Sequence, residues 1–170
     1  SYRLIILLTL VVRKKKNYYF YGYFGKETFK VYLDTLRAGY GSRGYFLSRN
    51  KQEPFLQFGD KFLNKGDIVI DGGANQGIFS LSFKSKIKDE GKVISIEPFK
   101  YAVNKLRKNF FLNNFKNLII YKNTLSNNNK INKIYFSNNI SDASVIFKRG
   151  NNYKLVKSIS SIWFLTGVIS

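Results

Sequence analysis

The chain has 170 residues, with 29 Lys and Arg against 10 Asp and Glu and a formal net charge of +19, which is enough for one domain and hardly for two. It contains no Cys and no His, which excludes disulfides, thiolate nucleophiles and Cys-ligated metals, and removes the commonest general base and zinc ligand. We predict no metal site. The charge favours a nucleic acid or an anionic membrane surface as partner, but scattered lysines also follow from biased composition alone.

The first apolar segment comprises residues 4–12 and precedes four consecutive basic residues at 13–16. It is too short to span a bilayer, which takes about 20 residues. Two interpretations stay open. The segment is a buried strand or helix, or it is the tail of a membrane anchor whose basic cluster marks the cytoplasmic side. The chain begins with Ser1 and not with Met, so we expect a fragment of a cytoplasmic protein, membrane-associated through residues 4–16 under the second interpretation.

Over residues 17–45 tyrosines alternate with other residues, and several Lys and Arg lie among them. Such interleaving suits the stacking of nucleic-acid bases. Alternation is more typical of a small β-rich cap with amphipathic strands, which is the interpretation we prefer. Residues 1–52 are therefore predicted to be an amino-terminal cap or anchor region.

A buried strand, a glycine turn and a helix follow from residue 68. Ile68-Val69-Ile70 is a continuous β-branched run, as expected for a strand covered on both faces of a parallel sheet. Asp71 ends the strand, Gly72-Gly73 allows a sharp turn, and residues 76–86 form an apolar-rich helix. This unit opens nucleotide-binding α/β folds, whose ligands bind beyond the carboxyl ends of the strands.

The spacing of the turn, residues 71–77, indicates which ligand it suits. A dinucleotide site needs Gly-x-Gly-x-x-Gly, whereas this turn reads Asp-Gly-Gly-Ala-Asn-Gln-Gly. An acid at the strand end repels a pyrophosphate and suits a ligand with an ammonium and a sulfonium. The pattern therefore favours S-adenosylmethionine over NAD, FAD or ATP. The alternative is a generic α/β turn in which Asp71 caps the helix.

A second strand, residues 91–97, also ends in an acid, Glu97, followed by Pro98. A carboxylate at this place, roughly 20 residues after the first strand, grips a ribose diol in related folds. A helix is predicted over 101–113, a third buried strand over 118–121, and an antiparallel hairpin between residues 134–136 and 144–147.

These motifs resemble the FkbM-type family of S-adenosylmethionine-dependent methyltransferases over residues 44–128. The resemblance rests on Gly66-Asp67, the turn at 71–77, Glu97-Pro98, and the spacing Leu-x-x-Asn-x-x-Leu-Asn-x-x-x-Asn that starts at Leu106. It implies a seven-stranded Rossmann-like sheet and methylation of a hydroxyl, often on a sugar or natural product. The residues it implies for cofactor binding are Glu53, Asp71, Gly72, Gly73, Ala74, Asn75, Gly77, Glu97 and Pro98.

The resemblance stops before the end of the chain. The family continues with a fourth strand carrying Lys-x-Asp-x-Glu-Gly and three more strands, none of which is recognisable here. We therefore predict an incomplete class I methyltransferase sheet of the α/β class, with three strands plus a hairpin and the small cap. Residues 53–157 would form a partial Rossmann-like domain, and 158–170 an aberrant or truncated end. The strand bearing Asp71 would then be an exposed edge.

The predicted function is O-methylation of a hydroxyl on a glycan or small molecule, with S-adenosylmethionine as cofactor. Without His the base is expected to be a carboxylate, and we name no catalytic residue. Two alternatives stay open: an RNA-binding module or RNA methyltransferase using the basic, Tyr-rich region, and a non-catalytic fragment. The sequence does not indicate an oligomeric state.

Overall fold

The centre of the molecule is a parallel sheet of three strands, β3 (Ile68–Gly72), β4 (Lys92–Ile96) and β5 (Leu118–Tyr121), in the order β3-β4-β5. Helix α4 (Ile78–Ile87) connects β3 to β4, and α5 (Lys100–Leu112) connects β4 to β5. This β-α-β-α-β order is one half of a doubly wound sheet, which confirms the predicted Rossmann-like α/β class. The computed structural model describes residues 18–33, 55–56, 59–136 and 151–160.

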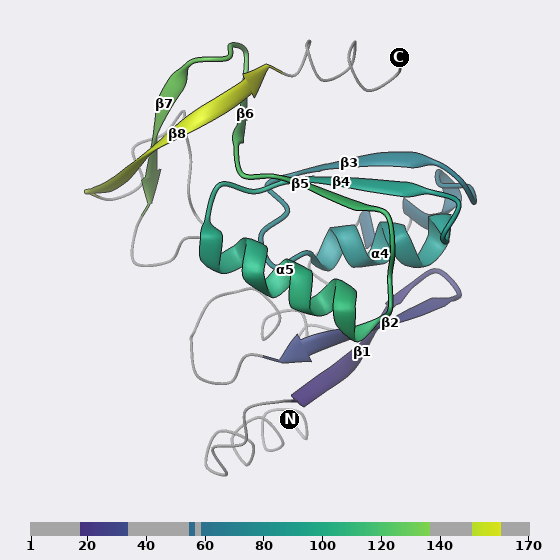
Figure 1. Ribbon diagram of the computed structural model, residues 1–170. Coiled ribbons are helices and arrows are strands. Elements are labelled where there is room, and N and C mark those ends of the chain that lie inside the picture. Colours follow the sequence, from purple (N-terminus) through teal and green to yellow (C-terminus); the bar gives the residue numbers. More distant parts are fainter. Residues whose placement is uncertain (1–17, 34–54, 57–58, 137–150, 161–170) are drawn as a thin grey trace.

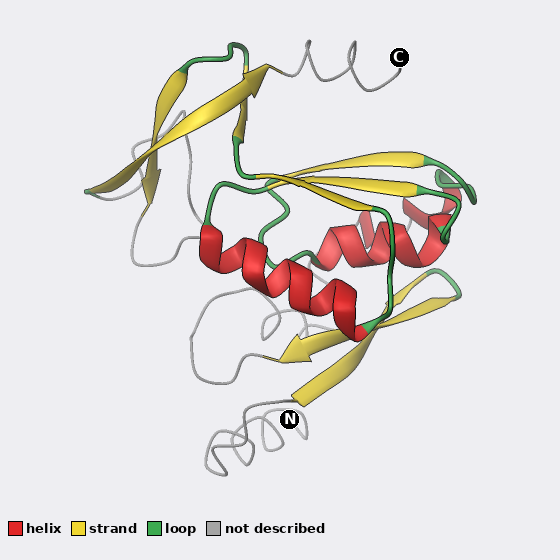
Figure 2. Ribbon diagram, in the orientation of Figure 1, coloured by secondary structure: helices red, strands yellow, loops and turns green. Residues whose placement is uncertain are grey.

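The helices lie between two β layers, as Figures 1 and 2 show. Both helices cover one face of the sheet, and an antiparallel hairpin of β1 (Tyr18–Phe24) and β2 (Glu27–Leu33) covers their other side. The core between these layers takes apolar residues from all of them, so the cap predicted at the amino terminus is packed on the sheet domain. Its members include Phe24, Phe29, Val31, Leu81, Phe83, Ile87, Val93, Leu106 and Phe110.

A second sheet of three strands stands beside the carboxyl edge of the first and has the order β6-β8-β7. It comprises β6 (Thr124–Ser126), β7 (Ile131–Phe136) and β8 (Asn152–Ser160). The hairpin predicted between residues 134–136 and 144–147 includes residues that lie outside the described ones. Within the described part of the chain β7 pairs with β8, with Ile134 opposite Lys154. β8 also continues to Ser160, past the predicted boundary after residue 157.

The face of the parallel sheet opposite the helices is also apolar. Ile94 and Ile96 are buried there and pack with Ile159 of β8, and Leu125 of β6 packs against the same cluster. Within the described part of the chain β3 pairs with β4 alone, and Ile68 is 55% exposed. The strand bearing Asp71 is therefore an edge strand in that part, as predicted.

Residues 4–16, predicted as a buried element or an anchor, lie outside the described residues. Across the described ranges, none of the helices has the length and apolar character needed to cross a membrane.

Asn109 of α5 and Asn113, which directly follows this helix, close the outer edge of β2. The Asn113 amide accepts the Lys30 N–H at 2.6 Å and donates to the Lys30 carbonyl at 2.7 Å, as a neighbouring strand would. Asn109 accepts the Tyr32 N–H at 2.7 Å and donates to the Gln76 carbonyl at 2.9 Å. These hydrogen bonds give partners to backbone groups on the edge of β2 that would otherwise be unpaired. They also connect the hairpin to the turn after β3.

We expect Asn109→Ala to lower the free energy of unfolding by about 2–4 kcal/mol, because it leaves the Tyr32 N–H and the Gln76 carbonyl without this partner. Asn109 is 1% exposed, so water cannot replace the amide. Urea unfolding measures the change. Asn104→Ala is the matched control, since Asn104 lies on the exposed side of the same helix, and an equal loss in both variants would contradict the role assigned to Asn109.

Candidate functional site

The turn between β3 and α4 folds back onto the end of β4. The N–H groups of Gly73 and Ala74 both donate to the Ile96 carbonyl, at 2.9 and 3.1 Å. Gly73, Asn75 and Gly77 adopt left-handed backbone angles, with φ of 77°, 49° and 87°. The glycines and the asparagine are the residue types that accept this conformation most readily, so this sequence is suited to the sharp return of the chain.

The three glycines of the turn have different surroundings. A Cβ on Gly77 would lie 2.9 Å from Leu106 Cγ, and one on Gly72 would lie 2.5 Å from Leu125 Cδ1. Leucine side chains therefore occupy the space beside both of these glycines. Among the described residues, a Cβ on Gly73 would meet no atom within 4 Å. With respect to that part of the chain, the turn borders open space at Gly73, where a ligand can approach the main chain.

Asp71, at the end of β3, is a buried acid held by serine hydroxyls. The Ser80 hydroxyl donates to Asp71 Oδ2 at 2.5 Å, and it lies 2.8 Å from the Ser95 hydroxyl. Burial raises the pKa of Asp71 above its ordinary value, and the hydrogen bonds from Ser80 partly offset that rise. A carboxylate with few polar partners in such a place favours a cation beside it.

Glu97, directly after β4, is 5% exposed and holds two chain segments. Its carboxylate accepts the Asn75 N–H on one oxygen and the Phe99 N–H on the other, both at 2.8 Å. Burial raises the pKa of Glu97, and these two hydrogen bonds act against the rise. The charge of Asp71 raises the pKa further and that of Lys154 lowers it. The charge of Asp71 therefore reaches Glu97, although burial has the larger effect on its pKa.

The structure brings all but one of the predicted cofactor-binding residues to the carboxyl edge of β3 and β4. Glu53 is the exception, because it lies outside the described residues. The others are Asp71, Gly72, Gly73, Ala74, Asn75, Gly77, Glu97 and Pro98.

Sequence reasoning missed three polar side chains at this edge. Ser80 and Ser95 contact the Asp71 carboxylate directly or through one another, and the only signal for them was a small polar residue within an apolar helix or strand. Lys154 donates to the Pro98 carbonyl at 3.0 Å. Its place depends on the path of β8, which the local sequence does not encode.

The turn is poorly suited to a phosphate. Phosphate-binding turns present free backbone N–H groups to the anion. Here the N–H groups of Gly73, Ala74, Asn75 and Gly77 all donate within the protein. In the described residues there is no cluster of three or more His, Cys, Asp or Glu side chains that would hold a metal ion. The arrangement offers two buried carboxylates beside an open space, which suits a cationic organic ligand.

No family model matches the sequence, and no curated protein matches it. Among solved structures, the chain is similar to a protein proposed to be an rRNA methylase from Clostridium thermocellum, with 20% identity and a TM-score of 0.38 over 38% of this chain and 37% of that chain. It is also similar to a protein-L-isoaspartate O-methyltransferase, with 18% identity and a TM-score of 0.33 over 62% of this chain and 28% of that chain. The chain thus spans well under half the length of either protein.

We expect Ser80→Ala to destabilise the protein in a pH-dependent way. Because burial raises the folded-state pKa of Asp71, this acid contributes less stability as the pH rises from about 4, the ordinary carboxyl range, through the raised pKa. Losing the hydroxyl raises that pKa further. The deficit should be about 1.5–3 kcal/mol near pH 7.5 and smaller near pH 4, because the raised pKa favours the protonated form of Asp71 at the lower pH.

Urea unfolding at the two pH values tests this expectation. Ser82→Ala is the matched control, because the Ser82 hydroxyl is buried in the same helix but donates to the Ile78 carbonyl at 2.9 Å. Its deficit should not change with pH. A deficit for Ser80→Ala that is equal at both pH values would show that Ser80 does not stabilise the ionised form of Asp71.

Proposed function

We propose that this chain is the S-adenosylmethionine-binding part of a methyltransferase that acts on a hydroxyl group. The observation that carries the proposal is the pair of buried carboxylates, Asp71 and Glu97, at the ends of adjacent parallel strands and beside the open space at Gly73. The spacing of the motifs, through its resemblance to the FkbM-type family, supports the hydroxyl acceptor.

Charge is the first support for this ligand. Both carboxylates have raised pKa values because burial disfavours their ionised forms, and a cation beside them would offset that penalty. S-adenosylmethionine carries an ammonium and a sulfonium. A dinucleotide or ATP would instead place phosphates against two acids and a turn in which the N–H groups of Gly73, Ala74, Asn75 and Gly77 already donate within the protein.

The two ends of this ligand would contact different residues of the site. Asp71, Gly73 and Asn75 would line the methionine end, and Glu97 would accept hydrogen bonds from the ribose hydroxyls. Each Glu97 oxygen accepts one backbone N–H and retains a lone pair for a hydroxyl. Further contacts are proposed for Glu53, Gly72, Ala74, Gly77 and Pro98.

The cofactor, when bound, supplies a methyl group activated by a positively charged sulfur. Transfer of that group to a hydroxyl would require a base that takes the hydroxyl proton. The residues of the turn act by alignment, which accounts for much of the rate in such displacements. Asp71 and Glu97 are engaged with Ser80 and with backbone N–H groups, so we assign neither as the base. A glycan or a small molecule is the proposed acceptor.

We expect Gly73→Ala to weaken S-adenosylmethionine binding at least roughly tenfold, because the added methyl would occupy the space beside the turn. Its positive φ should also lower stability by about 1–2 kcal/mol. Gly66→Ala is the matched control: φ is 90°, the nearest atom to its Cβ would be 4.0 Å away, and Gly66 precedes β3 at the opposite end of the sheet. It should lose similar stability and no affinity.

Isothermal titration with S-adenosylmethionine and its demethylated product measures these affinities, and titration with NAD is the comparison. Equal affinities in the Gly73→Ala and Gly66→Ala proteins would place the ligand elsewhere. Binding of NAD, with no binding of the methyl donor or its product, would overturn the proposed function.

We expect Glu97→Gln to weaken binding by about 1–3 kcal/mol, because a charged acceptor is lost from the ribose subsite. Stability should also fall, because the –NH₂ group of Gln would replace one of the two carboxylate oxygens that now accept backbone N–H groups. Glu90→Gln is the control: Glu90 is exposed and pairs with Lys65 at 2.7 Å. An unchanged dissociation constant for Glu97→Gln would limit Glu97 to a structural role.

A further inference from the structure

The hairpin presents a row of tyrosines to solvent. Residues of β1 alternate, so that Phe24 lies in the core while Tyr19, Tyr21 and Tyr23 point away from it and are 48%, 52% and 56% exposed. The Tyr19 and Tyr21 rings lie edge to face, with centroids 5.9 Å apart. Burying large rings is normally favourable, so three half-exposed rings on one face of a strand indicate a surface that contacts another molecule.

Lysines are interleaved with these rings. In the register of the hairpin, Lys30 lies opposite Tyr21 and Tyr32 lies opposite Tyr19. The Lys30 ammonium is 5.3 Å from the centre of the Tyr19 ring. Helix α5 adds Lys105, whose ammonium is 4.7 Å from the centre of the Tyr32 ring, and Lys108 at 5.6 Å. The surface therefore combines ring faces with positive charge.

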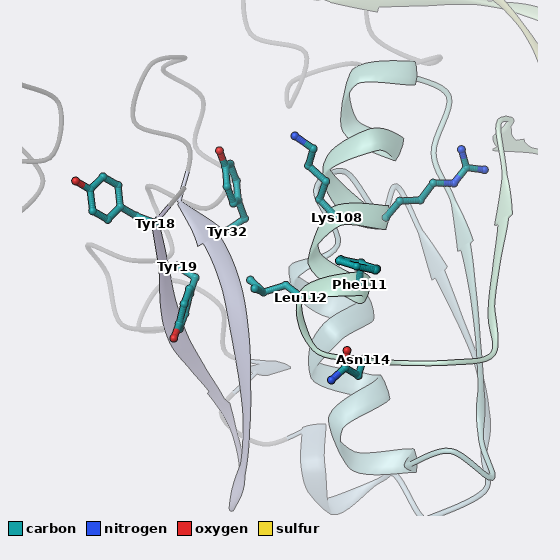
Figure 3. A pocket seen from close by; sticks show the side chains of 8 residues that line it. Tyr18, Tyr19, Tyr32, Lys108, Phe111, Leu112 and Asn114 are labelled. Atoms are coloured by element: carbon teal, nitrogen blue, oxygen red, sulfur yellow. The ribbon is translucent and has the colours of Figure 1, made fainter. Parts of the chain in front are cut away.

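A groove continues this surface between the hairpin and the end of α5. Figure 3 shows Tyr19 and Tyr32 on the two strands and Phe111, Leu112 and Lys108 on the facing helix. The groove has a volume of about 790 Å³ and is lined mainly by apolar atoms. Phe111 is 84% exposed, which is unusual for a phenylalanine within a packed helix.

Cations predominate in this region. Helix α5 contains Lys100, Lys105, Arg107 and Lys108 and no acid. In the described residues of the hairpin, the one acid is Glu27. It lies next to the turn of the hairpin and pairs with Lys88, directly after α4. Asp60 also lies against the turn of the hairpin, beside Gly25. Among the described residues, a ligand that lies along Tyr19, Tyr21 and the groove therefore meets mainly cations.

We propose that this surface binds single-stranded nucleic acid. We call it the tyrosine face and define it as Tyr19, Tyr21, Tyr23, Lys30 and Tyr32 with the groove beside α5. Exposed aromatic rings stack on bases irrespective of sequence, and lysines and arginines along the same path neutralise phosphates. A neutral glycan would also stack on tyrosines, but it would gain nothing from the interleaved cations.

The tyrosine face is separate from the proposed cofactor site. Glu97 and Pro98 precede the amino terminus of α5, whereas Lys108 and Phe111 lie near its carboxyl terminus. A helix of 13 residues is roughly 20 Å long. Binding at the face therefore does not depend on methyl transfer, and each can be measured without the other.

Fluorescence anisotropy of the full chain with labelled U-rich RNA and T-rich DNA of about 12 nucleotides tests the inference, over a range of salt concentrations. Tyr19→Ala/Tyr21→Ala should weaken binding about tenfold or more, and Tyr19→Phe/Tyr21→Phe should retain it because the ring is kept. Lys105→Ala/Lys108→Ala should reduce the slope of log affinity against log salt by about 1.4, since each cation contributes roughly 0.7 with single strands.

Matched controls come from the second sheet. Tyr153 is 54% exposed with the Lys133 ammonium 4.8 Å from its ring, so Tyr153→Ala removes a similar residue elsewhere. Lys122→Ala/Lys130→Ala removes two exposed charges outside the face. Both control proteins should bind as the unchanged chain does. Binding of RNA alone or of RNA and DNA supports the inference.

Three results would overturn the inference: equal losses in the face and control variants, no binding of either oligonucleotide by the unchanged chain, or binding of a neutral maltooligosaccharide at the face without binding of oligonucleotides. Titration of S-adenosylmethionine into Tyr19→Ala/Tyr21→Ala separates the two proposals. Retained cofactor affinity shows that the variant is folded and that the loss of oligonucleotide binding is local to the tyrosine face.

Discussion

The side-chain amide of Asn109 is the interaction that joins the layers of this molecule. It accepts the Tyr32 N–H from the hairpin and donates to the Gln76 carbonyl in the turn after β3, from a helix that packs between them. Because the amide is buried, the loss of either hydrogen bond would lower the free energy of unfolding. The position of the hairpin and the shape of the turn are therefore coupled through one residue, and Asn113 repeats the contact with β2 one helical turn further on.

The same constraint, that buried polar groups need partners, shapes the site. Glu97 uses both carboxylate oxygens to hold the turn and the start of α5, and Asp71 is held by Ser80. These bonds fix two acids in a place where burial opposes their ionisation. The turn is thus ordered by its own acids and backbone rather than by a bound phosphate. A cation entering beside Gly73 would relieve the electrostatic penalty that the fold imposes.

The parts of this structure that follow from local sequence were predictable. The β-branched run at residues 68–70 and the apolar run at 118–121 predict β3 and β5 to within about a residue of their bounds. Asp71 lies near the end of β3, and Glu97 directly follows β4. The spacing of Asn109 and Asn113 is visible in the sequence, but their structural role is not. Their partners Tyr32 and Lys30 are 77 and 83 residues away. The pairing of β7 with β8 was missed for the same cause: strand partners are chosen by packing over long separations.

Helix α5 also explains how a chain with a net charge of +19 can offer a site for a cationic ligand. Charges in solvent are screened over about 8 Å at physiological ionic strength, whereas α5 is roughly 20 Å long. The exposed cations near its carboxyl end therefore have little effect on Asp71 and Glu97, which lie at its other end and are buried. At that end the positive pole of the helix stabilises the ionised form of Glu97, and the Phe99 N–H donates to it directly. The side chains nearest each end of the helix, Glu97 before its amino end and the exposed cations near its carboxyl end, therefore decide which ligand is favoured there more than the net charge does.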